Sequence, residues 1–149
     1  MCPKGKLSLK ERYTYILKWF QENKPHVESE LDFENGFQLI TAVVLSAQCT
    51  DKRVNIVTPP LFKKYPTAEA MSKASFEDIF ALIRSVTYPN NKAKHLLALA
   101  EMLVSKYNSE IPASSGELQK LPGVGRKTAN VVASILFNEP VIAVDTHVF

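Results

Sequence analysis

The sequence predicts an all-α fold, and three observations lead to that prediction. Helix-capping residues recur along the chain, apolar residues repeat at helical spacing between them, and no low-complexity tract interrupts the pattern. The 149 residues are 46% hydrophobic and 22% charged, which is typical of a folded domain and unlike a disordered chain. We therefore expect one compact helical unit with a sizeable core.

A first helix is predicted over residues 9–22. Ser8 and Glu11 form a capping box, in which the serine hydroxyl accepts from the third backbone amide and the glutamate accepts from the serine amide. Apolar residues then follow at helical spacing, namely Tyr13, Ile16, Leu17 and Phe20. The pattern indicates an amphipathic surface helix.

The next segment, residues 37–47, is apolar on almost every face. That composition suits a helix enclosed by other helices, while its β-branched residues leave a buried strand as the alternative. The length of the run without a turn signal favours a central helix.

Further caps divide the middle of the chain into helices. Thr50–Asp51 begins one helix, in which Pro59–Pro60 is expected to cause a kink or a restart, because proline lacks a backbone donor and clashes with the preceding turn. Two more caps are predicted at Thr67 and Ser75. Residues 90–107 carry apolar residues at helical spacing and should form the longest helix.

A glycine-containing motif follows at residues 121–129. It separates a short helix beginning near Ser115 from a second helix that runs to about Phe137. Gly123 and Gly125 allow a tight reversal, and they expose backbone amides at a helix N-terminus, where a phosphate is attracted without any reading of base sequence. A helical hairpin whose glycine turn binds nothing is the alternative.

The motif resembles the endonuclease III family. Leu121–Val132 and Ile142–Val148 strongly resemble the helix-hairpin-helix and the aspartate segment of that family. Leu45–Gln48 and Asn90–Ala93 are similar to further family segments in the same order, so that the resemblance covers residues 9–149.

The resemblance implies a helix-hairpin-helix DNA glycosylase fold. Residues 26–149 would form its helical-barrel lobe, with the hairpin at about 115–137 and a catalytic aspartate loop at 139–149. The helix within residues 1–25 would belong to a second lobe that is incomplete in this chain.

Two residues are expected to carry the chemistry. The resemblance implies that Lys127 attacks the sugar C1′, expels the base, forms an imine and permits β-elimination, and that Asp145 assists by accepting a proton or by stabilising positive charge. At the start of a helix, the positive dipole end and partial burial would leave part of the Lys127 amine neutral. The alternatives are a lysine that only binds phosphate and an aspartate that only caps a helix. His147 is interpreted as a structural hydrogen-bonding residue.

Several further residues are predicted to contact DNA. The resemblance implies that Gln48 enters the gap left by an extruded nucleotide, although a merely polar helix terminus is the alternative. Val86–Asn90 departs from the Ile-Gly-Leu-Tyr-Asn pattern of the family, so Tyr88 becomes an aromatic wedge unless this loop is rearranged. The remaining predicted contacts are Lys92 and the hairpin residues Gly123, Val124, Gly125, Arg126 and Thr128.

The expected partner is double-stranded DNA that contains damaged bases or abasic sites, with oxidised pyrimidines as substrates. Two other functions fit parts of the pattern. A mismatch-specific adenine glycosylase usually has a small residue where Lys127 stands, and a non-catalytic helix-hairpin-helix module would need neither Asp145 nor Gln48.

The resemblance also implies a [4Fe-4S] cluster on four closely spaced cysteines near the carboxyl terminus of a full-length protein. This chain has only Cys2 and Cys49, so no cofactor is expected in it. We expect the chain to be a fragment with weak or no activity. The full-length protein should be monomeric, whereas the exposed apolar stripe of residues 1–25 favours self-association or partial disorder.

Charge and hydropathy add two weaker expectations. A formal net charge of +3 is compatible with a nucleic-acid partner but does not by itself indicate one. No apolar run approaches the length needed to cross a bilayer, and the amino terminus lacks the core of a signal peptide. An intracellular, nucleoid-associated protein is expected.

Overall fold

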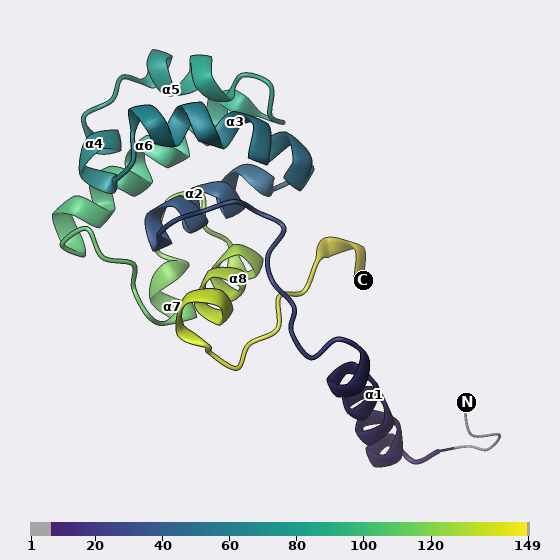
Figure 1. Cartoon of the computed structure of the whole chain (residues 1–149). Helices are drawn as coiled ribbons and strands as arrows, with labels where there is room; N and C mark the ends of the chain where they lie inside the picture. The colour runs from purple at the N-terminus through teal and green to yellow at the C-terminus, as the bar shows by residue number, and fades with distance from the viewer. Residues whose placement is uncertain (1–6, 149) are drawn as a thin grey trace.

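The computed structural model describes residues 7–148, and the regular secondary structure in that range is all helical, with no strand in it (Figure 1). The all-α prediction is confirmed. Cys2 lies outside the described residues. The helices are α1 (Leu9–Asn23), α2 (Gly36–Ser46), α3 (Asp51–Lys64), α4 (Ala68–Ser72), α5 (Phe76–Ile83), α6 (Pro89–Lys106), α7 (Ser115–Leu118), α8 (Arg126–Phe137) and the short 3-10 helix η1 (Thr146–Val148).

Helix α2 is the centre of the fold. Every residue from Phe37 to Leu45 is buried, and α2 packs against α3, α6 and α8 (Figure 1). Its amino end is capped by the Asn35 side chain, which accepts from the Gln38 amide at 2.9 Å. The prediction of an enclosed helix rather than a strand is confirmed, and α2 fixes the relative positions of its three neighbours.

The predicted caps form as expected. The Ser8–Glu11 capping box is complete, and the Thr50 hydroxyl accepts from the Arg53 amide at the start of α3. Thr67 and Ser75 cap α4 and α5 in the same way. Helix α6 is the longest within residues 7–148, as predicted. Local hydrogen bonds at helix starts therefore account for most of the element boundaries.

Pro59 and Pro60 do not restart a helix, so that part of the prediction is wrong, while a kink in α3 stays a prediction. Helix α3 continues through both residues. Each proline leaves one backbone carbonyl in the preceding turn without its helical donor, but both proline residues are exposed, on a side of the helix where water can hydrate those carbonyls. The opposite face is anchored in the core by Val54, Val57, Thr58 and Leu61.

Helix α1 contributes nothing to this core. It lies apart from the other helices, to which an extended segment joins it, and none of its residues is buried (Figure 1). Tyr13 and Leu17 are each 61% exposed, and Ile16 and Phe20 are exposed as well. The predicted apolar stripe is therefore on the surface, whereas self-association and the domain boundary near residue 25 stay predictions. No helix within residues 7–148 has the length and apolar character required to cross a membrane.

Candidate active site

The hairpin between α7 and α8 is anchored by apolar side chains and shaped by glycine. Leu121 and Val124 are buried, and the Val124 amide donates to the Leu121 carbonyl at 3.2 Å. Gly123 has a φ of +76°, and a Cβ atom there would lie 2.8 Å from the Cβ of His95. An L-residue would therefore be strained at Gly123 and would also clash with α6.

The amino end of α8 is open to a ligand. Gly125 is the N-cap, it offers no side-chain cap, and no atom lies within 4 Å of where its Cβ would be. The first backbone amides of α8 thus have no capping partner from the N-cap side chain, and they form the positive end of the helix dipole. Arg126 and Lys127 follow at the exposed first turn, while Thr128 is half-buried.

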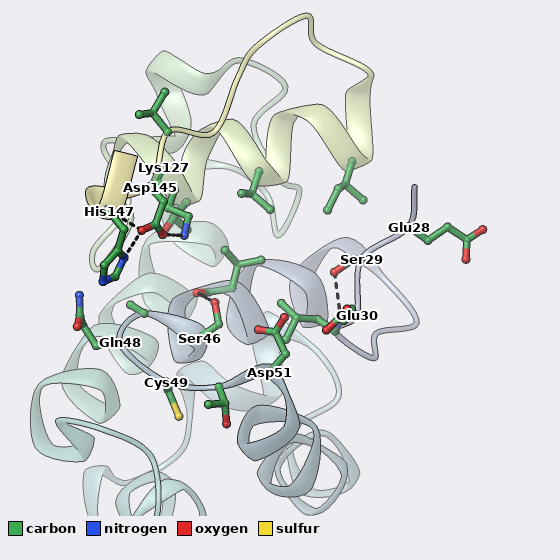
Figure 2. A pocket seen from close by; sticks show the side chains of 18 of the residues that line it. Glu28, Ser29, Glu30, Ser46, Gln48, Cys49, Asp51, Lys127, Asp145 and His147 are labelled. Carbon is green, nitrogen blue, oxygen red and sulfur yellow. Dashed lines mark hydrogen bonds and ion pairs between the residues drawn. The ribbon is translucent and has the colours of Figure 1, made fainter. Parts of the chain in front are cut away.

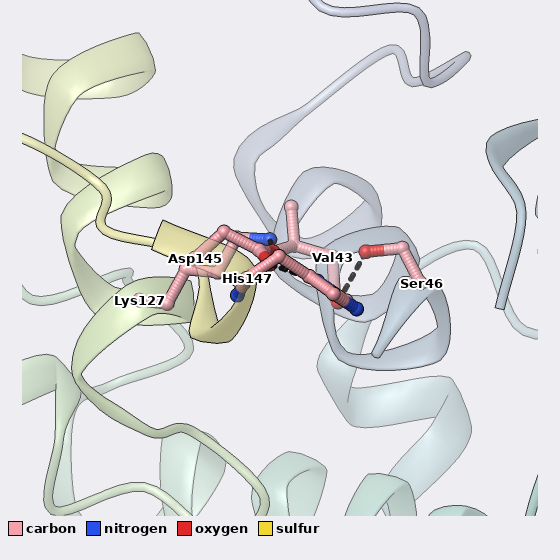
Figure 3. Close-up of polar contacts among 5 residues, drawn as sticks. All are labelled: Val43, Ser46, Lys127, Asp145 and His147. Carbon is pink, nitrogen blue, oxygen red and sulfur yellow. Dashed lines mark hydrogen bonds and ion pairs between the residues drawn. The ribbon is translucent and has the colours of Figure 1, made fainter. Parts of the chain in front are cut away.

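Lys127 and Asp145 meet beside this helix end. The chain returns from α8 through residues 138–145, and the Asn130 side chain holds the returning segment by donating to the Ile142 carbonyl at 2.9 Å. The Lys127 ammonium then forms an ion pair with Oδ2 of Asp145 (Figure 3). The two predicted catalytic residues therefore share one site.

The predicted partial burial of Lys127 is wrong. Its side chain is 53% exposed, because it stands on the solvent side of the first turn of α8. The position of Lys127 as the second residue of α8 agrees with the prediction.

Asp145 is surrounded by donors. Its Oδ1 accepts from the His147 amide at 3.0 Å and lies 2.5 Å from Nδ1 of the His147 ring (Figure 3). The Lys127 ammonium, the His147 amide and the His147 ring together hold the pKa of the Asp145 carboxyl well below its usual range. The same carboxylate begins the short turn η1, so Asp145 both caps a helix and partners the lysine.

A cavity of about 870 Å³ opens next to this pair (Figure 2). Its walls come from residues 27–31, the carboxyl end of α2, one face of α8 and the loop of Asp145. Residues 27–31 carry no recognisable motif. They form a wall of the site only because the folded chain brings them beside it. Polar lining residues outside the predicted set are Glu28, Ser29, Glu30, Ser46, Thr50 and Asp51.

Gln48 lies on the edge of this cavity, directly after α2. Its backbone is left-handed, with a φ of 55°, and its side chain is exposed (Figure 2). The Gln48 carbonyl accepts from Oγ1 of Thr87 at 2.7 Å. The structure therefore brings Gln48 to the same cavity as Lys127 and Asp145, while its contact with DNA stays a prediction.

Tyr88 immediately precedes α6 and does not line the cavity. It has a φ of 53° and is 66% exposed, and Pro89 follows it as the first residue of the helix. Tyr88 is tied to the Gln48 loop through its neighbour Thr87. Its role as a wedge between bases stays a prediction.

Lys92 is not available to DNA, so its prediction as a DNA contact is wrong. It is only 6% exposed, and its ammonium donates to the Leu45 carbonyl at 2.8 Å and to the Ala47 carbonyl at 2.6 Å. Burial lowers the pKa of Lys92, although a nearby Cys49 opposes that shift. The lysine satisfies carbonyls at the end of α2 that the helix itself leaves without donors.

Comparison with known proteins assigns the family. Residues 41–149 match the model of the HhH-GPD superfamily base excision DNA repair proteins. The chain is 47% identical over 134 residues to an endonuclease III of Rickettsia felis and 51% identical over 124 residues to one of Bacillus subtilis. The chain belongs to the endonuclease III family.

A solved structure of a trapped endonuclease III–DNA covalent intermediate has the same fold. It is 48% identical to this chain and superimposes with a TM-score of 0.87, covering 95% of this chain and 67% of the solved one. The curated endonuclease III relatives are longer. This chain covers 63% of the Rickettsia felis protein and 57% of the Bacillus subtilis protein, while 90% and 83% of this chain are matched.

The cluster implied by resemblance to the endonuclease III family does not fit this chain. A [4Fe-4S] cluster needs four thiolates, and the sequence has two cysteines. Within residues 7–148 there is also no group of three or more His, Cys, Asp or Glu side chains suited to a metal ion. The presence of a [4Fe-4S] cluster in a longer, full-length protein stays a prediction.

Replacing Lys92 should lower stability more than replacing an exposed lysine of the same helix. Lys92→Met keeps the length of the side chain but removes the donor to two carbonyls, so we expect the free energy of unfolding to fall by about 2 kcal/mol. Lys94→Met is the matched control because Lys94 is exposed, and it should change this free energy by less than about 0.5 kcal/mol. Urea unfolding measures both, and equal effects would contradict the capping role.

Asp145 should remain ionised in acid. The ordinary pKa of an aspartate side chain is 3.8, and the pKa of Asp145 in the folded chain is lower. The ion pair therefore contributes to stability at pH values above 3.8, and this contribution is lost only as the pH falls through the lower folded pKa. A ¹³C NMR titration of the Asp145 carboxyl should therefore show mostly carboxylate at pH 3.8. In Lys127→Gln the midpoint should rise towards the ordinary value, and a wild-type midpoint at or above 3.8 would refute this assignment.

Proposed function

We propose that this chain carries the catalytic site of a base excision DNA glycosylase and abasic-site lyase. One observation carries the proposal: the Lys127 amine and the Asp145 carboxylate meet at the open amino end of α8, beside a cavity. A nucleophilic amine, an adjacent carboxylate and backbone amides for a phosphate are the groups that cleavage of a glycosidic bond through an imine requires.

The amine acts as the nucleophile. Nζ of Lys127 forms a bond to C1′ of the damaged nucleotide, while the bond from C1′ to the base breaks and the base leaves with its electron pair. Loss of a proton from the amine and opening of the sugar ring give an imine, and loss of a C2′ proton then expels the 3′-phosphate. Attack requires Lys127 without its extra proton, which passes to solvent water as the sugar enters and the ion pair with Asp145 opens. The departing base takes up a proton from solvent.

Asp145 acts through its negative charge. Lys127 and the two His147 hydrogen bonds lower its pKa, and the His147 hydrogen bonds remain when the ion pair opens, so the carboxylate is a weak proton acceptor. A persistent negative charge beside C1′ instead stabilises the positive charge that develops on the sugar as the base leaves. The two His147 contacts keep Oδ1 turned away from the lysine, so that Oδ2 alone faces the reacting centre.

The hairpin holds the DNA strand. Backbone amides at an uncapped helix start, together with exposed Arg126, favour a phosphate group independently of base sequence. Two solved endonuclease III complexes with DNA share 48% identity with this chain, which supports double-stranded DNA as its partner.

The substrate class follows from the family likeness. We propose DNA with oxidised pyrimidines or abasic sites, the damaged nucleotide being extruded into the cavity beside Lys127. Lys127 distinguishes this reading from a mismatch-specific adenine glycosylase, in which a small residue usually occupies that position. The Asp145 pairing and the cavity distinguish it from a hairpin that only grips DNA.

Borohydride trapping on abasic-site DNA tests the proposal. In excess over DNA, where even a weakly active chain needs to react only once, the wild-type chain should form a covalent adduct with the oligonucleotide because borohydride reduces the imine, and Lys127→Gln should form none. Lys120→Gln is the matched control, since Lys120 is also exposed and paired with a carboxylate, but lies on the far side of the hairpin turn. Equal trapping by wild type and Lys127→Gln, or none by wild type in excess over DNA, would rule out the lyase function.

The two hairpin glycines should respond differently to alanine. Gly125→Ala has room for its methyl group, so the free energy of unfolding should fall by less than about 1 kcal/mol, but the methyl group should obstruct a phosphate and weaken duplex binding. Gly123→Ala should lower the free energy of unfolding by about 2 kcal/mol or more, because of its φ and the His95 contact. Urea unfolding and fluorescence anisotropy at fixed salt measure the two effects. Unchanged binding by Gly125→Ala would contradict the phosphate role.

A further inference from the structure

Two residues beside the candidate site have an unfavourable backbone conformation. Gln48 and Tyr88 have φ values of 55° and 53°, in the left-handed region that residues with a Cβ rarely occupy. Tyr88 also precedes proline, which restricts its backbone further. Such conformations are strained and persist only where surrounding contacts hold them.

Thr87 supplies the contact that holds Gln48. Its hydroxyl donates to the Gln48 carbonyl at 2.7 Å across a sequence separation of 39 residues. Thr87 is itself anchored by its neighbour Val86, which is buried and whose amide donates to the Ile83 carbonyl at 3.0 Å. The loop before α6 therefore reaches across to the loop after α2 with a fixed donor.

The preceding carbonyls of the same loop are fixed by Lys92. Its ammonium binds the Leu45 carbonyl in α2 and the Ala47 carbonyl, so Ala47 is held from the start of α6 and Gln48 is held by Thr87 in the loop before α6. The Gln48 side chain, by contrast, is exposed and lines the cavity. The backbone is held from one side, and the side chain is left free to meet a ligand on the other.

We propose that Thr87 is a positioning residue for Gln48. This inference rests on the proposed function, in which Gln48 enters the gap that an extruded nucleotide leaves in the duplex. Through its hydrogen bond Thr87 keeps Gln48 in the left-handed conformation before DNA arrives, so that binding does not have to order this residue. Without the hydroxyl, the backbone at Gln48 relaxes to a commoner conformation, and its side chain leaves the gap-facing position.

A double-mutant cycle separates positioning from a general structural role. The measured quantity is the preference of the intact chain for a duplex with a tetrahydrofuran abasic-site analogue over an undamaged duplex, by fluorescence anisotropy. Thr87→Val keeps the shape but removes the donor, and it should reduce this preference about five- to tenfold, as the loss of one hydrogen bond predicts. In a Gln48→Ala background the same change should reduce it less than twofold. Thr87→Ser keeps the donor and should restore the preference to within twofold.

The alternative outcomes are distinct. An unchanged preference in Thr87→Val, or the same fold reduction with and without the Gln48 side chain, would overturn the inference, because a purely structural hydrogen bond acts equally in both backgrounds. Urea unfolding of each variant shows which binding changes follow from lost stability. If the wild-type chain has no preference for the abasic duplex, the proposed function fails first and the positioning role falls with it.

Discussion

The burial of α2 on all sides is the constraint on which the rest of the structure depends. Because every residue from 37 to 45 is buried against other helices, α3, α6 and α8 are held at fixed positions around one axis. This rigidity fixes the relative positions of the helices that line the candidate site. The carboxyl end of α2 carries Gln48 to one wall of the cavity, and α8, packed on α2, carries Lys127 to the opposite wall.

Charge within the site is arranged around Asp145. Its carboxylate binds an ammonium on one oxygen and a backbone amide with an imidazole on the other, although more than a third of the side chain is exposed. Solvent weakens each of these attractions, so the arrangement depends on geometry more than on burial. The returning segment, held by Asn130, is what places a carboxylate within reach of a lysine at the start of α8.

Local chemistry predicted most of the fold, and the family resemblance predicted that Lys127 and Asp145 share one site. Hydroxyl and amide caps act within three residues, so spacing alone located the starts of α1, α3, α4 and α5. Sequence spacing did not predict which way long side chains point. Lys92 was expected at the surface, yet it reaches into the end of another helix, and Lys127 was expected to be partly buried, yet it is exposed. The cavity wall at residues 27–31 depends on tertiary packing alone.

A buried lysine is a costly way to end a helix, and its position explains why this chain uses one. The last carbonyls of α2 lack donors from a following helical turn, apolar side chains cannot supply them, and the left-handed residue after the C-cap Ala47 is Gln48 rather than a glycine. Lys92 satisfies the Leu45 carbonyl in α2 and the Ala47 carbonyl after it from inside the fold, and Thr87 satisfies the Gln48 carbonyl. No capping group is then needed on the solvent side of the loop. The exposed face at Gln48 is left unobstructed, which a surface cap would not allow.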